Sequence, residues 1–342
     1  MNIRLAQDCD RERWDAYVLR ARHSSCYHLF VWKEIIEKSF GHRTCYFIAE
    51  DDSGNVTGVL PLALMKSLLF GKFLVSLPFF NYGGICADGE ETRYLLFRRA
   101  VDLCRRERAE HIELRQSAPI PGMPVKTAKV SMRLALPAKA EVLWESLGGK
   151  LRSQIRRPSK EGMYAILGKE EELESFYTVF AGNMRDLGTP VYSRSFFENI
   201  LQAFPASWIC TVYTADRKPA ASGMLIGFKD MLEIPWASSL KCHNRHSPNM
   251  LLYWRSLAFA CEEGYGFFDF GRSTPGGNTF RFKEQWGARP LQLYWNYWMR
   301  KGTTLPELNP NNPRYRAAIS LWKKLPLNVT KLLGPSIVKN LP

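Results

Sequence analysis

The apolar and polar positions of this chain follow one pattern twice. In the first half an acidic turn precedes an apolar strand, Val56–Leu64, and a second strand that ends at Leu77–Phe80. In the second half a turn precedes Ala220–Phe228, and the next strand ends at Ile234–Trp236. The prolines inside these two strand ends lie 157 residues apart. A self-similar pattern at one fixed period predicts a duplicated domain.

The repeat continues into a helix and a further strand. Tyr94–Arg108 and Met250–Glu263 carry apolar residues at spacings of three and four, which predicts helices that pack on a sheet. The strands His111–Arg115 and Phe267–Gly271 follow. Helix-rich segments open the two halves, at Asp10–Ala21, Trp32–Ser39, Glu170–Asp186 and Ser195–Ala203. We therefore expect two copies of one α/β (α+β) domain, with a site in or beside the cleft between the copies.

The composition is that of a globular protein with an anionic partner. Of the 342 residues, 46% are hydrophobic and 23% are charged, which predicts a packed core. Lys and Arg number 47 against 33 Asp and Glu, so the formal net charge is +14. This excess predicts nucleic acid, anionic lipid or a phosphate-bearing substrate as partner, although charge that serves only solubility would look the same.

Other features of the sequence bear on location. The N-terminal segment lacks the apolar core of a signal peptide. The most apolar run, Val59–Phe80, is interrupted by Lys66, Lys72 and two prolines, which argues against a membrane span. The eight cysteines are scattered and no CxxC occurs, a pattern typical of reduced thiols. We expect a cytoplasmic protein.

The segment Gly264–Gly287, GYGFFDFGRSTPGGNTFRFKEQWG, is the strongest candidate for chemistry. An apolar strand carries one acid, Asp269, and breaks at Gly271 into a Pro/Gly/Asn loop. Four further side chains follow within six residues, namely Arg281, Lys283, Glu284 and Trp286. Charge at the end of an apolar strand beside a glycine-rich loop is typical of α/β sites, and an ordinary solvated loop is the alternative. The first half lacks this block after Arg115, so we expect the chemistry in the second half.

A second charged segment, Lys150–Gly162, holds five cations in eleven residues. On a helix, three of them share one face by i, i+4 spacing, namely Arg152, Arg156 and Lys160. Like charges at that spacing are mutually destabilising, so a diphosphate or an RNA backbone would account for them. A merely solvated helix face is the alternative.

These two segments resemble motifs of the FemAB peptidyltransferases. Lys150–Gly162 is similar to the family's R-x-x-I-x-[RK]-x-x-K-x-G pattern, and Phe282–Gly287 is similar to its terminal FK-x-x-[FW]-G. The run DFGRSTPGGNTFRFKEQWG resembles still more the FemAB-related proteins of exosortase/PEP-CTERM exopolysaccharide systems. The resemblance implies tandem GNAT-like domains, each a mixed, mainly antiparallel sheet flanked by helices. It also implies transfer of an aminoacyl group from aminoacyl-tRNA to an amine of a cell-wall precursor, whereas more distant relatives use acyl thioesters.

On this basis we divide the chain into three parts. Residues 1–138 are predicted to form a first GNAT-like domain that holds substrate or serves as a scaffold. Residues 139–300 are predicted to form the catalytic GNAT-like domain. Residues 301–342 are predicted to form a basic, amphipathic C-terminal tail.

We predict Lys283 and Asp269 as the catalytic residues. The resemblance implies a functional lysine at position 283, where a fixed cation would stabilise negative charge on the reacting carbonyl oxygen. Asp269 would act as a general base, or alternatively hold the loop by accepting backbone N–H bonds. Positioning and charge stabilisation are expected to suffice without a covalent enzyme intermediate. We expect no metal, since Cys242, His243 and His246 lack a distant pair of ligands, and no tightly bound cofactor.

The residues predicted to bind substrate are Arg272, Arg281, Trp286, Ser238, Asn249, Tyr253, Arg152, Arg156, Lys160, Trp32 and Lys33. Arg272 and Arg281 have planar guanidinium groups that suit phosphate or carboxylate, or that pair with a neighbouring acid. Asn249 is alternatively a helix N-cap. Trp32 and Lys33 lie where the FemAB family often has a tryptophan followed by a substrate-binding lysine, although the spacing here differs.

The tail after Glu307 contains no acid and six cations, which are Arg314, Arg316, Lys323, Lys324, Lys331 and Lys339. An apolar stripe runs through Arg314–Leu325 and consists of Tyr315, Ala318, Ile319, Trp322 and Leu325. It predicts a helix on an anionic membrane surface, with peripheral attachment, or a helix packed on the second domain. Pro326 and Pro335 are expected to limit any helix beyond Leu325.

Together these features predict an acyltransferase that acts on an amine or hydroxyl of an envelope glycan or lipid-linked precursor. The donor is expected to be aminoacyl-tRNA or an acyl thioester such as acyl-CoA. The [QR]-x-x-G-x-[GA] loop of CoA-dependent enzymes is missing at the expected junctions, which disfavours CoA. The alternatives are a thioester-dependent acyltransferase for a small molecule and a non-catalytic module that tethers exopolysaccharide assembly at a membrane.

Overall fold

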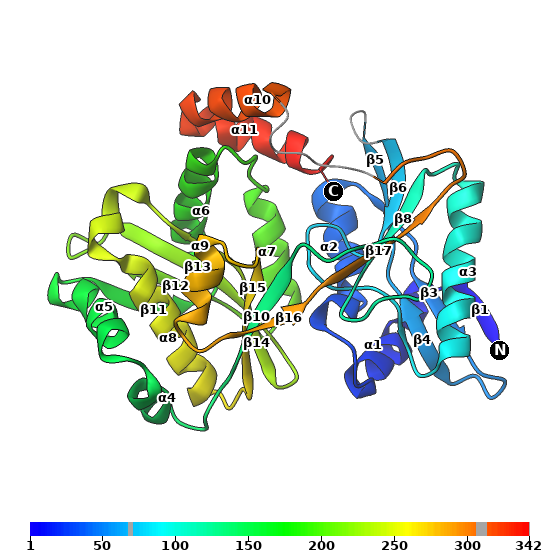
Figure 1. Cartoon of the computed structure of the whole chain (residues 1–342), viewed down its shortest axis with the longest axis horizontal. Coiled ribbons are helices and arrows are strands. Elements are labelled where there is room, and N and C mark those ends of the chain that lie inside the picture. Colours follow the sequence, from blue (N-terminus) through cyan, green and yellow to red (C-terminus); the bar gives the residue numbers. More distant parts are fainter. Residues whose placement is uncertain (68–70, 306–312, 342) are drawn as a thin grey trace. The chain divides into compact units, whose positions relative to one another are not determined.

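The chain divides into two compact units (Figure 1), in a computed structural model that describes residues 1–67, 71–305 and 313–341. The first unit comprises 1–130, 291–307 and 340–342, and the second comprises 131–290 and 308–339. The division therefore differs from the predicted boundaries after residues 138 and 300. Residues 131–138 belong to the second unit and 291–300 to the first.

The first unit contains two sheets and three α-helices. One sheet has the order β1-β3-β4-β7 and the other has the order β2-β5-β6-β8-β17-β9. The strands are β1 (Asn2–Leu5), β2 (Arg43–Thr44), β3 (Phe47–Glu50), β4 (Val56–Leu60), β5 (Ala63–Ser67), β6 (Gly71–Val75), β7 (Cys86–Ala87), β8 (His111–Gln116), β9 (Val125–Lys126) and β17 (Tyr294–Met299). The helices are α1 (Arg11–Arg20), α2 (Val31–Phe40) and α3 (Glu90–Arg106).

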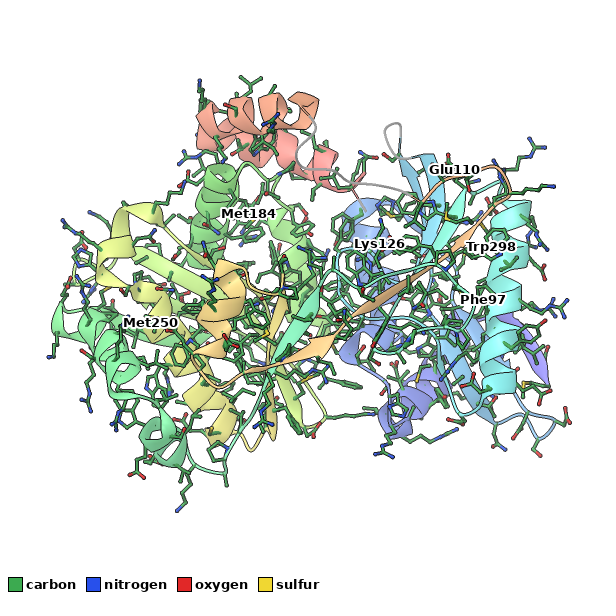
Figure 2. The ribbon with its side chains drawn as sticks, viewed as in Figure 1. Phe97, Glu110, Lys126, Met184, Met250 and Trp298 are labelled. Carbon is green, nitrogen blue, oxygen red and sulfur yellow. The ribbon has the colours of Figure 1, made fainter. Side chains whose placement is uncertain are left out.

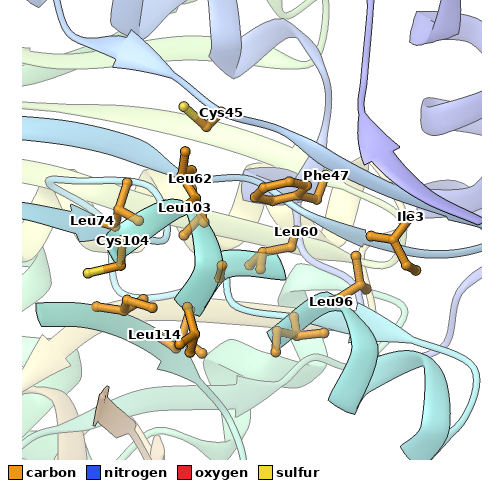
Figure 3. Packing of buried hydrophobic residues seen from close by; sticks show 14 of the residues in the cluster. Ile3, Cys45, Phe47, Leu60, Leu62, Leu74, Leu96, Leu103, Cys104 and Leu114 are labelled. Carbon is orange, nitrogen blue, oxygen red and sulfur yellow. The ribbon is translucent and has the colours of Figure 1, made fainter. Parts of the chain in front are cut away.

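The core of this unit forms between α3 and the strands (Figure 3). Leu96 and Leu103 of α3 pack in one buried cluster with Phe47, Leu60 and Leu114. The apolar spacing of three and four along α3 therefore has the predicted role of facing the sheet. Such buried leucine and phenylalanine side chains each contribute about 1.5–3 kcal/mol to folding.

One predicted strand of the first unit is interrupted. The sequence predicts a single strand over Val56–Leu64, but the structure has β4 and β5, which lie in different sheets. Pro61 stands between them, and a proline has no N–H with which to continue a strand ladder. The matching strand of the second unit has no proline in its interior and runs unbroken through ten residues.

The second unit has one sheet of seven strands, in the order β11-β12-β13-β14-β15-β10-β16. The strands are β10 (Val130–Ala135), β11 (Tyr164–Gly168), β12 (Ser207–Tyr213), β13 (Pro219–Phe228), β14 (Met231–Ser239), β15 (Phe267–Ser273) and β16 (Arg289–Gln292). The helices are α4 (Ala140–Ser146), α5 (Gly149–Lys160), α6 (Leu173–Leu187), α7 (Arg194–Ala203), α8 (Pro248–Glu262), α9 (Asn278–Glu284), α10 (Pro313–Lys324) and α11 (Leu327–Val338). Helices α6 and α8, which carry the labelled Met184 and Met250 in Figure 2, both pack on strands of this sheet.

The two units share the same central arrangement. In each, a long helix connects two parallel strands, β6 to β8 through α3 and β14 to β15 through α8. These are the helices and strands that the repeat predicts, and the fold class is confirmed as mixed sheets flanked by helices. The strand on the far side of β8 is β17, and the strand beside β15 is β10. Since β10 comes after β8 and β9 in the chain and β17 comes after β15 and β16, each of these two sheets contains one strand from the segment that follows the other sheet's strands.

The C-terminal tail forms two helices, α10 and α11, that pack against α6 (Figure 1). Trp322 is buried, and Ile319 lies against Gly188 at the end of α6. Part of the predicted stripe therefore faces the second unit, which is the alternative to a membrane-facing stripe. The side chains of Arg314 and Tyr315 lie outside the described residues.

The expectation that proline would end the helical tail was wrong. Helix α11 begins directly after Pro326 and includes Pro335. A proline before a helix loses no intrahelical bond, whereas Pro335, inside α11, lacks the N–H that would bond to the carbonyl oxygen of Lys331. Among the described residues, no helix has the length and apolar character needed to cross a membrane.

Candidate functional site

The parallel pair of the second unit separates partway along its length. Strands β14 and β15 are paired from Met231 with Phe267 to Glu233 with Asp269. Beyond these residues β14 continues to Ser239 and β15 to Ser273, and within the described residues no further register joins them. After Glu233, the register between β14 and β15 therefore ends within the described residues.

Gly271 explains where the strands separate. Its φ of 75° lies in the left-handed region, which strand residues other than glycine rarely adopt. A Cβ at this position would meet only the carbonyl oxygen of Ile234, at 3.7 Å, so conformation and not space requires the glycine. The left-handed residue turns β15 away from β14.

Asp269 holds this turn from inside the sheet. Its side chain is fully buried, and its Oδ1 accepts hydrogen bonds from the Gly271 N–H at 2.8 Å and from Ser131 Oγ at 2.5 Å. Its Oδ2 accepts from Arg133 Nε at 2.9 Å. These contacts match the structural alternative for Asp269, in which it fixes the loop through a backbone N–H.

Lys283 approaches the same turn from helix α9. Its side chain is only 7% exposed, and its Nζ donates to the carbonyl oxygens of Gly271 and Arg272, both at 3.0 Å. Burial lowers the pKa of Lys283 to about 8, opposed by the negative charges of Asp269 and Glu233 and assisted by the positive charge of Arg272. A protonated ammonium group has three N–H donors, so the two carbonyls leave one donor for another acceptor.

Sequence reasoning missed three side chains that support this centre. Ser131 and Arg133 belong to β10, about 140 residues before Asp269 in the chain. Their signal was the alternation of apolar and polar residues in VSMRLA, which indicates a strand. Glu233 is a buried acid on β14, paired in register with Asp269. The sequence feature that could have identified Glu233 is a single acid within an otherwise apolar strand.

Trp286 and Tyr253 are packing residues beneath α9. Trp286 is 1% exposed, and its ring lies 6.3 Å from those of Tyr253 and Phe282. The side chain of Trp286, which is predicted to contact substrate, is enclosed by its neighbours in this structure. Its Nε1 has no hydrogen-bond partner among the described residues. Tyr253 stacks on Phe270 at 5.5 Å, and burial raises the pKa of its hydroxyl.

The other predicted binding residues of this unit fall into two groups. Arg272 near the end of β15 and Arg281 on α9 are exposed, and both remain candidates for substrate contact. Ser238 is buried and accepts a hydrogen bond from Asn183 at 3.1 Å. Asn249 lies in the first turn of α8, whose N-cap is Ser247, so the alternative of Asn249 as the N-cap was wrong.

The predicted basic helix is present as α5. Arg152 is half-buried, while Arg156 and Lys160 are exposed. The guanidinium of Arg156 lies 4.9 Å from the Trp144 ring centroid, in a cation–π contact. At the end of α5, Glu161 contacts His246, one of the residues considered for metal binding. In the parts of the chain that the structure covers, no three His, Cys, Asp or Glu side chains are placed to hold a metal.

The predicted pair in the first unit, Trp32 and Lys33, has other contacts in this structure. Trp32 is fully buried, and its Nε1 donates to the carbonyl oxygen of Cys26 at 2.9 Å. This enclosure makes Trp32 a core residue and corrects its assignment to substrate binding. Lys33 instead forms ion pairs with Asp8 at 3.3 Å and Glu37 at 3.6 Å.

Comparison with known proteins identifies the second unit. Residues 148–284 match the family described as the acetyltransferase (GNAT) domain, so this unit carries a GNAT acyltransferase domain. The match spans α5 to α9 and ends one residue after Lys283. No curated protein matches the sequence.

Solved structures resemble the whole chain. FemX has a TM-score of 0.68 at 14% identity, over 95% of this chain and 100% of its own. The L-PGS structure from Bacillus licheniformis has a TM-score of 0.56 at 14% identity, over 95% of this chain and 97% of its own. A tandem GNAT protein from the clavulanic acid biosynthesis pathway has a TM-score of 0.54 at 10% identity, over 89% of this chain and 100% of its own. At these identities the likeness establishes the tandem GNAT fold.

Proposed function

We propose that this acyltransferase moves an aminoacyl or acyl group from an activated donor to an amine or hydroxyl of a cell-envelope glycan or lipid-linked precursor. The observation that carries the proposal is the buried ammonium group of Lys283 beside the separating strands β14 and β15. A buried cation with one unused donor suits the charge that develops in acyl transfer.

The stretch of β14 beyond its pairing with β15 offers hydrogen-bonding groups to a donor. Unpaired strand edges present backbone N–H and C=O groups at regular spacing, and polar groups at the acyl end of either donor class can bind to them. In this proposal the donor's activated carbonyl lies at the end of that edge, near Gly271 and Lys283. The acceptor then approaches from the side on which Arg272 is exposed near the end of β15.

The proposed reaction needs no covalent bond to the enzyme. The acceptor nitrogen or oxygen attacks the carbonyl carbon of the donor ester or thioester, and a new amide or ester bond forms. The bond from that carbon to the donor oxygen or sulfur breaks, and the acceptor's proton passes to solvent or to the leaving group. The third N–H of Lys283 would stabilise the negative charge on the carbonyl oxygen, an effect worth about 10²–10³ in rate for one lost donor in other enzymes.

Two donor classes fit the charge of the chain. The exposed cations of α5 suit the phosphates of aminoacyl-tRNA, and the FemX-like fold agrees with such a donor. An acyl thioester carried by CoA or a carrier protein has fewer phosphates to bind. We favour aminoacyl-tRNA, with the envelope glycan of an exopolysaccharide system of the PEP-CTERM type as the acceptor class.

The test is a transfer assay with labelled aminoacyl-tRNA and labelled acyl-CoA offered separately, using amine and hydroxyl acceptors on lipid-linked sugars. Lys283→Ala should lower kcat about 10²-fold or more with either productive donor. Lys139→Ala is the matched control, because Lys139 is an exposed lysine of the same unit. Full turnover by Lys283→Ala would remove this lysine from the mechanism, and transfer from acyl-CoA alone would reject the tRNA donor.

A further inference from the structure

Helix α11 uses only one of its faces to pack against its own unit. Thr330, Gly334 and Val338 are buried at successive spacings of four. Gly334 lies so close to Val191 that an added Cβ would come within 2.7 Å of its side chain. The ammonium group of Lys331 lies 5.3 Å from the ring centroid of Tyr177 on α6. These contacts fix the rotation of the helix about its axis.

Three apolar side chains of α11 outside the buried face are exposed to solvent. Leu332 is 77% exposed, Leu333 is 45% exposed and Ile337 is 39% exposed. At roughly 100° per residue, Leu332 lies opposite the buried face, and Leu333 and Ile337, one turn apart, lie between Leu332 and that face on one side of the helix. On α10, Leu321 is likewise 64% exposed. This exposed set excludes Ile319 and Trp322, which pack inward.

The charged residues of the two tail helices all have one sign. After Glu307 the chain contains six Lys and Arg residues and no Asp or Glu. Arg316, Lys323 and Lys324 are exposed on α10, and Lys339 is exposed just after α11. A second copy of the chain would bring like charges together, whereas an anionic lipid surface would pair with them and accept the leucines.

We propose that α11 lies on an anionic bilayer surface, with Leu332, Leu333 and Ile337 inserted at the level of the headgroups and the cations of α10 facing lipid phosphates. A helix of 12 residues is too short to span a bilayer, but this length suits an interfacial position. The docking face is the side of α11 that points away from α6. It is independent of Lys283, so binding to lipid and acyl transfer can fail separately.

The test is co-sedimentation of the full-length protein with vesicles of phosphatidylcholine alone or mixed with equal phosphatidylglycerol. We expect binding to the mixed vesicles, with weak binding to phosphatidylcholine. The double variant Leu332→Ser/Leu333→Ser keeps every charge and should lower the partition coefficient about tenfold or more. Lys323→Glu/Lys324→Glu keeps the apolar face and should lower it by a similar factor, since each cation near such a surface contributes about fivefold.

The control is Leu19→Ser/Val142→Ser, which changes two exposed apolar residues on α1 and α4. Circular dichroism and thermal melting verify that all variants remain folded. Equal vesicle binding by the leucine variant and the wild-type protein would overturn the docking face, and so would an absence of binding to mixed vesicles. Light scattering that shows a dimer lost only in the leucine variant, without vesicle binding, would assign the face to self-association.

Discussion

The Nζ of Lys283 lies 3.0 Å from the carbonyl oxygen of Gly271, the residue at which β15 turns away from β14. The N–H of the same glycine donates to Asp269 at 2.8 Å. A lysine and an aspartate thus hold the two peptide groups on either side of one left-handed glycine. The backbone conformation of Gly271, which separates the two strands, therefore also determines where the ammonium group of Lys283 lies.

Gly271→Ala should damage both stability and activity. An alanine in the left-handed region costs about 1–2 kcal/mol in the free energy of folding. If the backbone changes its φ to avoid this cost, the carbonyl group that Lys283 binds rotates away. Gly276→Ala is the matched control, because Gly276 has a similar φ of 72° in the exposed loop with no atom near an added Cβ. Urea unfolding should show a similar loss in both variants, whereas kcat should fall only in Gly271→Ala. Equal activity losses would mean that the glycine turn has no special connection to the site.

Stability should rise with pH above 8 because of Lys283. Its pKa is about 8 in the folded protein against an ordinary value of 10.5, so between these values the unfolded chain binds more protons. The free energy of unfolding therefore increases across this window, and the cost of burying the charge, about 3 kcal/mol below pH 8, is gone above 10.5. Lys283→Met lacks this dependence. Parallel curves of unfolding free energy for the two proteins from pH 7 to 10 would contradict the prediction.

The activity should fall above pH 8, the reverse of the stability trend, because the proposed role needs the protonated lysine. Asp269 raises the pKa of Lys283, so Asp269→Asn should shift the alkaline limb of kcat to lower pH. Ser131→Ala removes one hydrogen bond to Asp269 but keeps its charge, and should leave the limb in place. The measurement is kcat against pH for the wild-type protein, Asp269→Asn and Ser131→Ala. Electrostatic coupling moves the alkaline limb to another pH, whereas a loss of folded protein lowers kcat without moving that limb.

The sequence predicted the longer helices and the repeated central strands, because helical spacing and apolar runs are local signals. Helices α3 and α8 and strands β8 and β15 follow directly from the apolar pattern. The contacts that build the site are not local. Ser131 and Arg133 reach Asp269 only because β10 joins the second sheet, and strand exchange leaves no mark in periodicity.

The sequence also could not show which side of a helix or strand is buried. The stripe on α10 fits a membrane or a protein core equally well, since both accept the same apolar spacing. Trp32 and Trp286 fitted a family pattern, but the structure encloses both rings. Which side of a helix or strand is covered depends on elements distant in the chain.

The exchange of β10 and β17 between the two sheets has a consequence for synthesis on the ribosome. The sheet that contains β8 lacks a strand until residues 294–299 have left the exit tunnel, so the edge of β8 stays unpaired while residues 131–290 of the second unit are made. Meanwhile β10, the next long strand to emerge, is available to pair with that edge in the wrong sheet. Folding of the sheet that contains β8 is therefore completed only late in translation.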